Sequence, residues 1–173
     1  MNQITINNTV IEIFVGELTN AQYDAIVIPT NSRLLPSGKL RCKTLREAGS
    51  KVQVECNRII QKKTNIQVGT VVITSGGDLS SKYIIHANAG HDGKKLMLTT
   101  WNALKLADKN GIKSILLPPI SKELIGFNSK VCANIMIPTI KKYILEKNIN
   151  LRNISICLEN LPDYKEFEKK LNS

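Results

Sequence analysis

The residues that could bind an anion are concentrated in one stretch of the chain. Positions 33–63 hold nine basic and two acidic residues, so this stretch contributes +7 to the formal net charge of +10. Its first part places four cations after Ser37 and Gly38, namely Lys39, Arg41, Lys43 and Arg46. Small residues before a helix let its first-turn N–H groups and its dipole receive an anion. The four cations are therefore candidates for contacts with phosphate or nucleic acid, and the alternative is a solvated helix start.

Residues for metal binding or covalent chemistry are sparse. His86 and His91 have no cysteine or carboxylate at ligand-like spacing, and the four cysteines include no Cys-x-x-Cys pair. Ser121 has no base partner evident in the sequence, and Cys42 lies among cations but has no histidine close to it. We predict no metal site, no cofactor and no nucleophilic catalysis by these residues.

Length and composition favour one domain over positions 1–173. A chain of 173 residues that is 42% hydrophobic can bury a substantial core. No apolar run approaches the roughly 18 residues of a membrane span, and the polar start does not resemble a secretion signal. We expect a cytoplasmic protein without a membrane partner.

Apolar periodicity predicts the elements that must position the candidate residues. Seven stretches rich in β-branched residues predict strands: QITI, VIEIFV, AIVIP, GTVVIT, KYIIHA, KSILLP and NISICL. Helical spacing separates them, with Gly49 expected to divide one segment into two helices, Pro138 expected to kink or restart another, and a short helix expected over 163–171. The predicted apolar helix faces contain Leu45, Val52, Cys56, Ile59, Ile60, Met97, Trp101, Leu104, Met136, Ile140, Tyr143 and Ile144. Strands alternating with helices predict an α/β fold, with a mixed sheet between helical layers.

The loops after the strands are the candidate ligand-binding segments, because open α/β sheets bind ligands beyond the carboxyl ends of their strands. TNSRLLPSGKL follows AIVIP, PISKELIGFNS follows SILLP, and ENLPDY follows ISICL. The first two contain small residues that lead into a helix, as a phosphate site requires. Taken alone they are not specific, since serine and glycine also cap ordinary helices.

The order of these segments resembles the macro domain, a family whose characteristic ligand is ADP-ribose. VGELT is similar to the family's Gly-Asp-Ile opening, DAIVIPTNSRL to its Asp-Ala-Ile-Val-Asn-Ala-Ala-Asn motif, and GTVVITSGGDLSSKYIIHANAG to its Gly-rich turn and Tyr-Ile-Ile-His segment. LKLADKNGIKSILLPPIS resembles the helix, strand and Pro-Ala-Ile-Ser of the family. Pro-Thr-Asn at 29–31 and His-Ala-Asn at 86–88 look most similar to the macro domain of a histone variant. The resemblance spans nearly the whole chain and implies a three-layer α/β/α fold.

The resemblance also implies a binding site that departs from the family pattern. Glu17 takes the place of an Asp that holds the adenine amine, and Asn31 is the residue expected at the distal ribose. Glu123 replaces a glycine of the second phosphate loop, and Glu159 aligns with the aromatic residue that covers adenine in the histone-variant domain. Ligand contacts are thus implied for Glu17, Leu18, Asn31, Ser37, Gly38, Lys39, Leu40, Ser121, Lys122, Glu123, Leu124 and Ile125.

Three functions follow as hypotheses. The first is a divergent, weak and non-catalytic binding module for ADP-ribose or a related nucleotide, either free or attached to a macromolecule. The alternative is a macro domain that binds RNA or single-stranded DNA through the basic surface. The third is an ADP-ribosyl hydrolase. It is disfavoured because Ile28 replaces the first Asn of the motif, and Arg41 stands where hydrolytic members carry an Asp.

Overall fold

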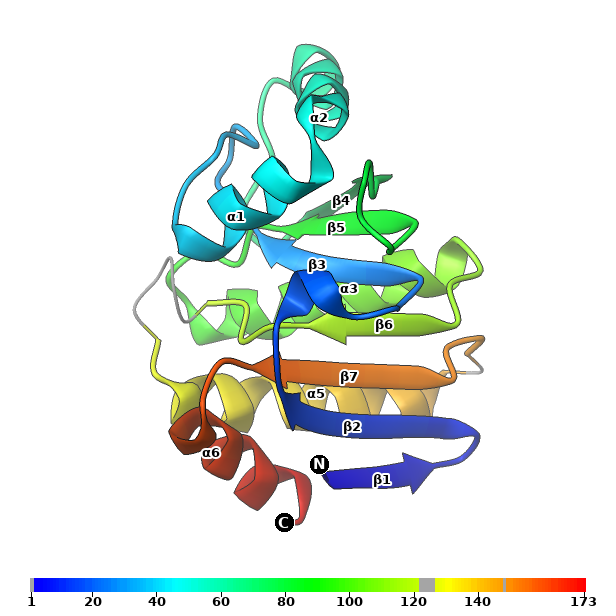
Figure 1. The fold of residues 1–173 in the computed structure, drawn as a ribbon. Helices are drawn as coiled ribbons and strands as arrows, with labels where there is room; N and C mark the ends of the chain where they lie inside the picture. Colours follow the sequence, from blue (N-terminus) through cyan, green and yellow to red (C-terminus); the bar gives the residue numbers. More distant parts are fainter. Residues whose placement is uncertain (1, 122–126, 148) are drawn as a thin grey trace.

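A seven-stranded mixed sheet forms the centre of the computed structural model, which describes residues 2–121, 127–147 and 149–173 (Figure 1). The strands are β1 (Asn2–Ile6), β2 (Thr9–Val15), β3 (Ala25–Pro29), β4 (Val71–Ser75), β5 (Tyr83–Ala87), β6 (Ser114–Leu117) and β7 (Asn153–Leu158). Their order across the sheet is β1-β2-β7-β6-β3-β5-β4. The five inner strands are parallel, and the two edge strands are antiparallel to their neighbours. All seven strands predicted from the sequence are confirmed.

Helices cover both faces of the sheet. They are the 3-10 turn η1 (Leu18–Asn20), α1 (Lys39–Ala48), α2 (Ser50–Lys63), α3 (Gly93–Lys109), α5 (Ser129–Glu146) and α6 (Leu161–Leu171). One apolar core joins α3, α5 and α6 to one sheet face, and a second joins α1 and α2 to the other (Figure 1). Each fully buried Leu or Ile in these cores contributes about 1.5–3 kcal/mol relative to an exposed one. The predicted three-layer α/β/α fold is confirmed. No helix of the described residues is long and apolar enough to cross a membrane.

The apolar pattern of each strand reflects its place in the sheet. All five residues of β3 are buried, because this central parallel strand is covered on both faces. In β2, which lies beside the edge strand β1, fully buried residues alternate with partly exposed ones. The second pattern arises because α1 and α2 cover only the half of the sheet that contains β3, β5 and β4 (Figure 1).

Gly49 separates α1 from α2, as predicted. Its φ is +86°, in the left-handed region that favours glycine, and its N–H donates to the carbonyl of Leu45 at 3.1 Å. A Cβ at this position would lie 2.7 Å from the Oδ2 of Asp78. The turn between the two helices therefore favours glycine for its backbone conformation, and a larger residue would also displace the Asp78 side chain.

One prediction about the helices is wrong, and one of two alternatives is excluded for another. Met97 is 50% exposed, because the buried face of α3 is shifted by one position and contains Leu96, Thr100, Ala103, Leu104 and Ala107. Pro138 does not restart its helix, since α5 runs without interruption from Ser129 to Glu146. Pro138 and Asn134 are both exposed, so the carbonyl that loses its i+4 N–H lies on the solvent side of α5. Ile59 and Ile60 are only half-buried.

Candidate functional site

A cleft of about 580 Å³ opens at the carboxyl ends of the parallel strands. Residues 16–19 after β2, Pro29 at the end of β3, residues 118–119 after β6 and several residues after β7 line it. The arrowheads of these strands point to the same edge of the sheet (Figure 1). Four residues with implied ligand contacts line the cleft: Glu17, Leu18, Lys39 and Leu40. Its volume suits a small organic ligand.

The amino end of α1 forms one wall of this cleft. The helix begins at Lys39 after Gly38, whose φ of 70° and ψ of 164° set the turn into the helix. Lys39 and Leu40 line the cleft, and the first turn contains no acidic residue. Lys39 is exposed, as is Arg46 further along the helix. The positive end of the α1 dipole therefore lies at the cleft, where an anion would be stabilised.

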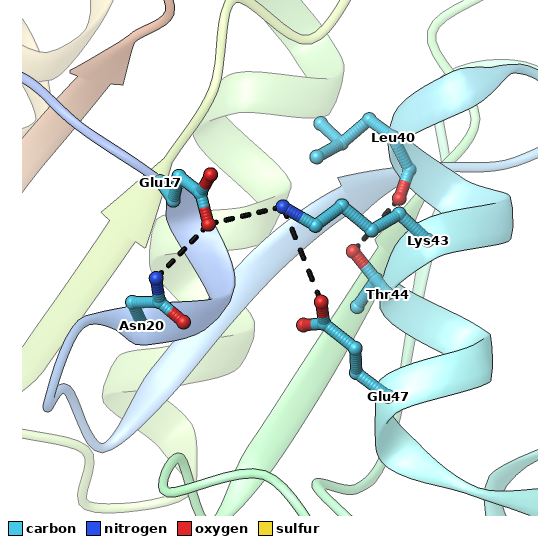
Figure 2. Close-up of polar contacts among 6 residues, drawn as sticks. All are labelled: Glu17, Asn20, Leu40, Lys43, Thr44 and Glu47. Carbon is cyan, nitrogen blue, oxygen red and sulfur yellow. Dashed lines mark hydrogen bonds and ion pairs between the residues drawn. The ribbon is translucent and has the colours of Figure 1, made fainter.

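An ion pair joins two walls of the cleft (Figure 2). Lys43 Nζ on α1 lies 3.0 Å from an oxygen of Glu17 and 4.0 Å from one of Glu47. Asn20 Nδ2 also donates to the Glu17 carboxylate, at 2.9 Å. Two carboxylates thus balance the charge of Lys43, for which the sequence suggested either a phosphate contact or a solvated cation. The Lys43 side chain is 32% exposed and that of Glu17 59% exposed, so the pair contributes only about 0–1 kcal/mol and opens at small cost.

Asn31 organises the loop after β3 through both ends of its side chain. Its Nδ2 donates to the carbonyl of Leu35 at 2.8 Å and to Ser37 Oγ at 2.9 Å. Its Oδ1 accepts from the backbone N–H groups of Arg33 at 3.0 Å and Leu35 at 3.1 Å. The residue expected at the distal ribose therefore also fixes the loop that leads into α1.

Arg41 corrects the sequence prediction most clearly. We expected a phosphate-contacting or solvated cation, but the side chain is fully buried. Its guanidinium donates to the carbonyls of Leu34 and Leu35 at 2.9 Å each and to that of Pro29 at 3.5 Å, and it lies 2.8 Å from His86 Nδ1. The prediction failed because helical spacing places Arg41, Thr44, Leu45 and Ala48 on the face of α1 that packs on the sheet.

The contact with Arg41 defines the protonation of His86. A guanidinium only donates, so Nδ1 accepts and the proton lies on Nε2, which is 2.9 Å from Thr74 Oγ1. Burial and then the charge of Arg41 hold the pKa of His86 well below its ordinary value. Burial likewise raises the pKa of Cys56, whose Sγ lies 4.0 Å from Nε2. This buried group is therefore a neutral imidazole beside a thiol, and its contacts join α1, α2, β4 and β5.

A second cavity of about 340 Å³ adjoins the cleft, and Pro29 lines both. Asn31 and Ser37 line it from the loop after β3, and Asn88 and His91 from the segment after β5. The described residues that line it include no carboxylate. Sequence reasoning placed Asn31 and Ser37 at the site but missed Asn88 and His91. The rule that ligands bind beyond strand ends applies to β5 as well and could have indicated them.

The segment after β6 is only partly described. Ser121 is fully buried, and its Oγ has no hydrogen-bond partner among the described residues. The other residues of the second phosphate loop, Lys122, Glu123, Leu124 and Ile125, lie outside the described residues. The adjoining Ile120 lines the second cavity.

The end of β7 and the third loop add residues that the sequence analysis did not single out. Cys157, Asn160 and Asp163 line the cleft beside Glu159. Asn160 Oδ1 caps α6 by accepting from the N–H of Asp163 at 2.9 Å, and the buried Asp163 carboxylate accepts from Ser129 Oγ. The Asn-x-x-Asp spacing with a proline between is a capping signal that could have indicated this turn. Burial raises the pKa of Cys157 to about 11, so it remains a thiol at neutral pH.

Comparison with known sequences assigns this chain to one family. A model described as Macro domain matches residues 27–136. The chain is 32% identical over 171 residues to a macro domain-containing protein of Listeria monocytogenes, covering 94% of this chain and 97% of that protein. It is 31% identical over 169 residues to O-acetyl-ADP-ribose deacetylase 1 of Pantoea vagans, covering 94% of this chain and 98% of that protein.

Solved structures agree with the sequence match. The Oceanobacillus iheyensis macrodomain with ADP has a TM-score of 0.94 at 26% identity, covering 99% of this chain and 94% of that one. The Trypanosoma brucei macrodomain in complex with ADP-ribose has a TM-score of 0.85 at 27% identity, covering 92% of this chain and 68% of that one. The predicted family is confirmed, and the chain belongs to the macro domain family.

Proposed function

We propose that this macro domain binds ADP-ribose or a related adenine nucleotide without transforming it. The observation that carries the proposal is a pair of adjoining cavities, of about 580 and 340 Å³, at the carboxyl ends of the parallel strands. Together they suit an elongated ligand with a charged centre, because the amino end of α1 lies at the cleft. The similar structures with bound ADP and ADP-ribose support the same ligand class.

The polar groups of the cleft suit the edge of an adenine base. The Glu17 carboxylate can accept from the exocyclic amine, and the Lys43 ammonium, 3.0 Å from it, can donate to a ring nitrogen. The diphosphate would then lie at the amino end of α1. The distal ribose would extend toward the second cavity, which Asn31 and Ser37 line.

We expect the affinity for ADP-ribose to be weak, with a Kd above about 1 μM by titration calorimetry. The base must share Glu17 with Lys43 and Asn20, and the third loop carries Glu159 where an aromatic residue would stack on adenine. Replacing Glu17→Gln should weaken binding about tenfold, since a charged acceptor of a hydrogen bond is lost.

Glu146→Gln is the matched control for the Glu17 variant. Glu146 also lies beside a lysine, 3.8 Å from Lys142, but at the carboxyl end of α5, away from the cleft. It should leave the affinity unchanged. A sub-micromolar Kd would contradict the expected weakness, and no binding of ADP-ribose or ADP at millimolar concentration would contradict the proposed function.

We further expect no turnover of O-acetyl-ADP-ribose or of a mono-ADP-ribosylated protein above the buffer rate. Arg41 replaces the expected acid, and the described lining of the second cavity offers no carboxylate to activate water. Glycosidic cleavage also builds positive charge on the sugar, which a nearby guanidinium opposes. Product analysis by chromatography measures this. Turnover that His91→Gln abolishes would contradict the expectation and assign the general base to His91, which is exposed at the second cavity.

Nucleic-acid binding stays a hypothesis with fewer candidate residues. Arg41 is buried and Lys43 is paired with carboxylates, which leaves Lys39 and Arg46 as exposed cations of the four expected contacts. Among the described residues of the site, we find no other contact that favours nucleic-acid binding over nucleotide binding.

A further inference from the structure

A positive charge lies behind the wall that the two cavities share. Arg41 Nη1 is 3.5 Å from the carbonyl oxygen of Pro29, and Pro29 lines both cavities. Arg41 Nε and Asn31 Nδ2 donate to the same Leu35 carbonyl, at 2.9 and 2.8 Å. Arg41 itself lines neither cavity. The guanidinium is thus next to the proposed ligand space but cannot touch a ligand there.

The charge of Arg41 has no carboxylate partner among the described residues. Its hydrogen bonds go to the carbonyls of Leu34, Leu35 and Pro29 and to neutral His86. The groups that act electrostatically on its pKa are the thiols of Cys56 and Cys42, after the larger effect of burial, which lowers that pKa. Carbonyl dipoles solvate the guanidinium without neutralising it, and an arginine stays protonated in proteins. A full positive charge therefore remains in the interior.

An interior charge without a counter-ion acts on its surroundings differently from a surface lysine. Its field passes through protein, whose effective dielectric of about 20 is well below that of water, so the field at a neighbouring cavity is attenuated less than it would be in water. At 0.1 M salt, the interaction between two exposed charges is largely screened beyond about 10 Å. The interaction of a buried charge is screened much less. An anion in either cavity would supply the counter-charge that Arg41 does not find among the described residues.

We propose that Arg41 is a specificity-determining residue that makes the site prefer nucleoside diphosphates to uncharged nucleosides without contacting them. The proposal rests on the proposed binding of nucleotides in the cleft. At a separation of about 10 Å and an effective dielectric near 20, one charge changes the affinity for a singly charged phosphate by roughly tenfold. The amino end of α1 and Lys39 add to this preference. Because they face solvent, salt screens their contribution.

Calorimetric titration of ADP and adenosine into four proteins tests the role of the charge. Arg41→Met should weaken ADP by at least about tenfold and adenosine by less than twofold, because ADP carries more than one negative charge and adenosine carries none. Arg41→Lys keeps the charge and should retain the ADP affinity within about threefold.

Arg152→Met is the matched control, since Arg152 also donates to backbone carbonyls, at 2.9 and 3.1 Å. It is exposed and precedes β7, at the amino ends of the parallel strands and so away from the cleft. It should change neither affinity. Equal weakening of ADP and adenosine in Arg41→Met, or unchanged ADP binding, would overturn the inference while leaving the proposed function intact.

A measurement on the wild-type protein keeps the inference testable if Arg41→Met does not fold. The ratio of adenosine Kd to ADP Kd is measured at 50 and 500 mM NaCl. A buried charge should leave this ratio within about threefold, whereas a preference due to exposed Lys39 should fall toward one. Loss of the preference at high salt would overturn the inference. If neither ADP nor ADP-ribose binds at either salt concentration, the proposed function and the inference both fail.

Discussion

Lowering the pH from 7.5 to 5 should reduce the free energy of unfolding by about 2 kcal/mol through His86 alone. His86 is fully buried, and burial together with the charge of Arg41 holds its folded-state pKa well below the ordinary 6.5. In the unfolded chain the imidazole takes up a proton below about pH 6.5. In the folded protein it stays neutral, because Nδ1 faces Arg41, Nε2 faces Thr74, and Cys56 is a thiol.

The sign of the effect follows from proton uptake. Below pH 6.5 the His86 imidazole binds a proton in the unfolded state but not in the folded state, so the free energy of unfolding falls as the pH falls. The loss approaches about 1.4 kcal/mol per pH unit and continues until the pH reaches the folded-state pKa. Most carboxylates titrate below pH 5, so the window between pH 7.5 and 5 isolates the histidine.

Urea unfolding at several pH values measures this effect. His91→Gln should keep the full loss, because His91 is exposed. His86→Gln should lower stability at pH 7.5, since it disturbs the contacts with Arg41 and Thr74, but it should flatten the profile between pH 7.5 and 5. A wild-type profile that is already flat in this window would show that His86 accepts a proton in the fold.

The fold could be predicted because each apolar pattern had one favourable solution. The run AIVIP is too short for a helix, and its consecutive apolar residues predict a strand that is buried on both faces. β3 is such a central, fully buried strand. Gly49 allowed the break between α1 and α2 to be placed from the sequence. The buried face of α3 was misplaced because Met97 and Leu98 are apolar yet half exposed, and a periodicity argument cannot distinguish them from Leu96.

The site could be predicted in its position but not in the state of its charges. Strand ends and family motifs indicated Glu17, Asn31 and Lys39, and these residues line the two cavities. The partners of each cation were not predictable, since Lys43 pairs with a glutamate 26 positions away. Arg41 is charged and lies in the first turn of a helix that begins after Gly38, so solvent exposure was the ordinary expectation. Its burial depends on three carbonyls and a histidine that meet only in the folded protein.

Asn31→Ala should weaken ADP-ribose binding by about thirtyfold, equivalent to about 2 kcal/mol. The substitution removes four hydrogen bonds, two donated to Leu35 and Ser37 and two accepted from Arg33 and Leu35. Each contributes about 0.5–1.5 kcal/mol, and part of that must be recovered from the ligand when it orders the loop. The loop lines the second cavity and leads into α1, so its disorder affects both ends of the proposed ligand.

Amide exchange distinguishes this positioning role from direct contact with the ribose. Asn31→Ala should speed exchange of the Arg33 and Leu35 amides, whose acceptor it removes. Ser37→Ala is the matched control, because it removes one of the four bonds, and it should weaken binding by less than about threefold. Thirtyfold weaker binding with unchanged exchange at both amides would contradict the positioning role. Asn31 would then act on the ligand directly, because the loop would have kept its order without the side chain.

If both amides exchange faster and the affinity for ADP-ribose is retained, ligand binding does not depend on the order of this loop. The diphosphate would then be held by the amino end of α1 and the charge behind it.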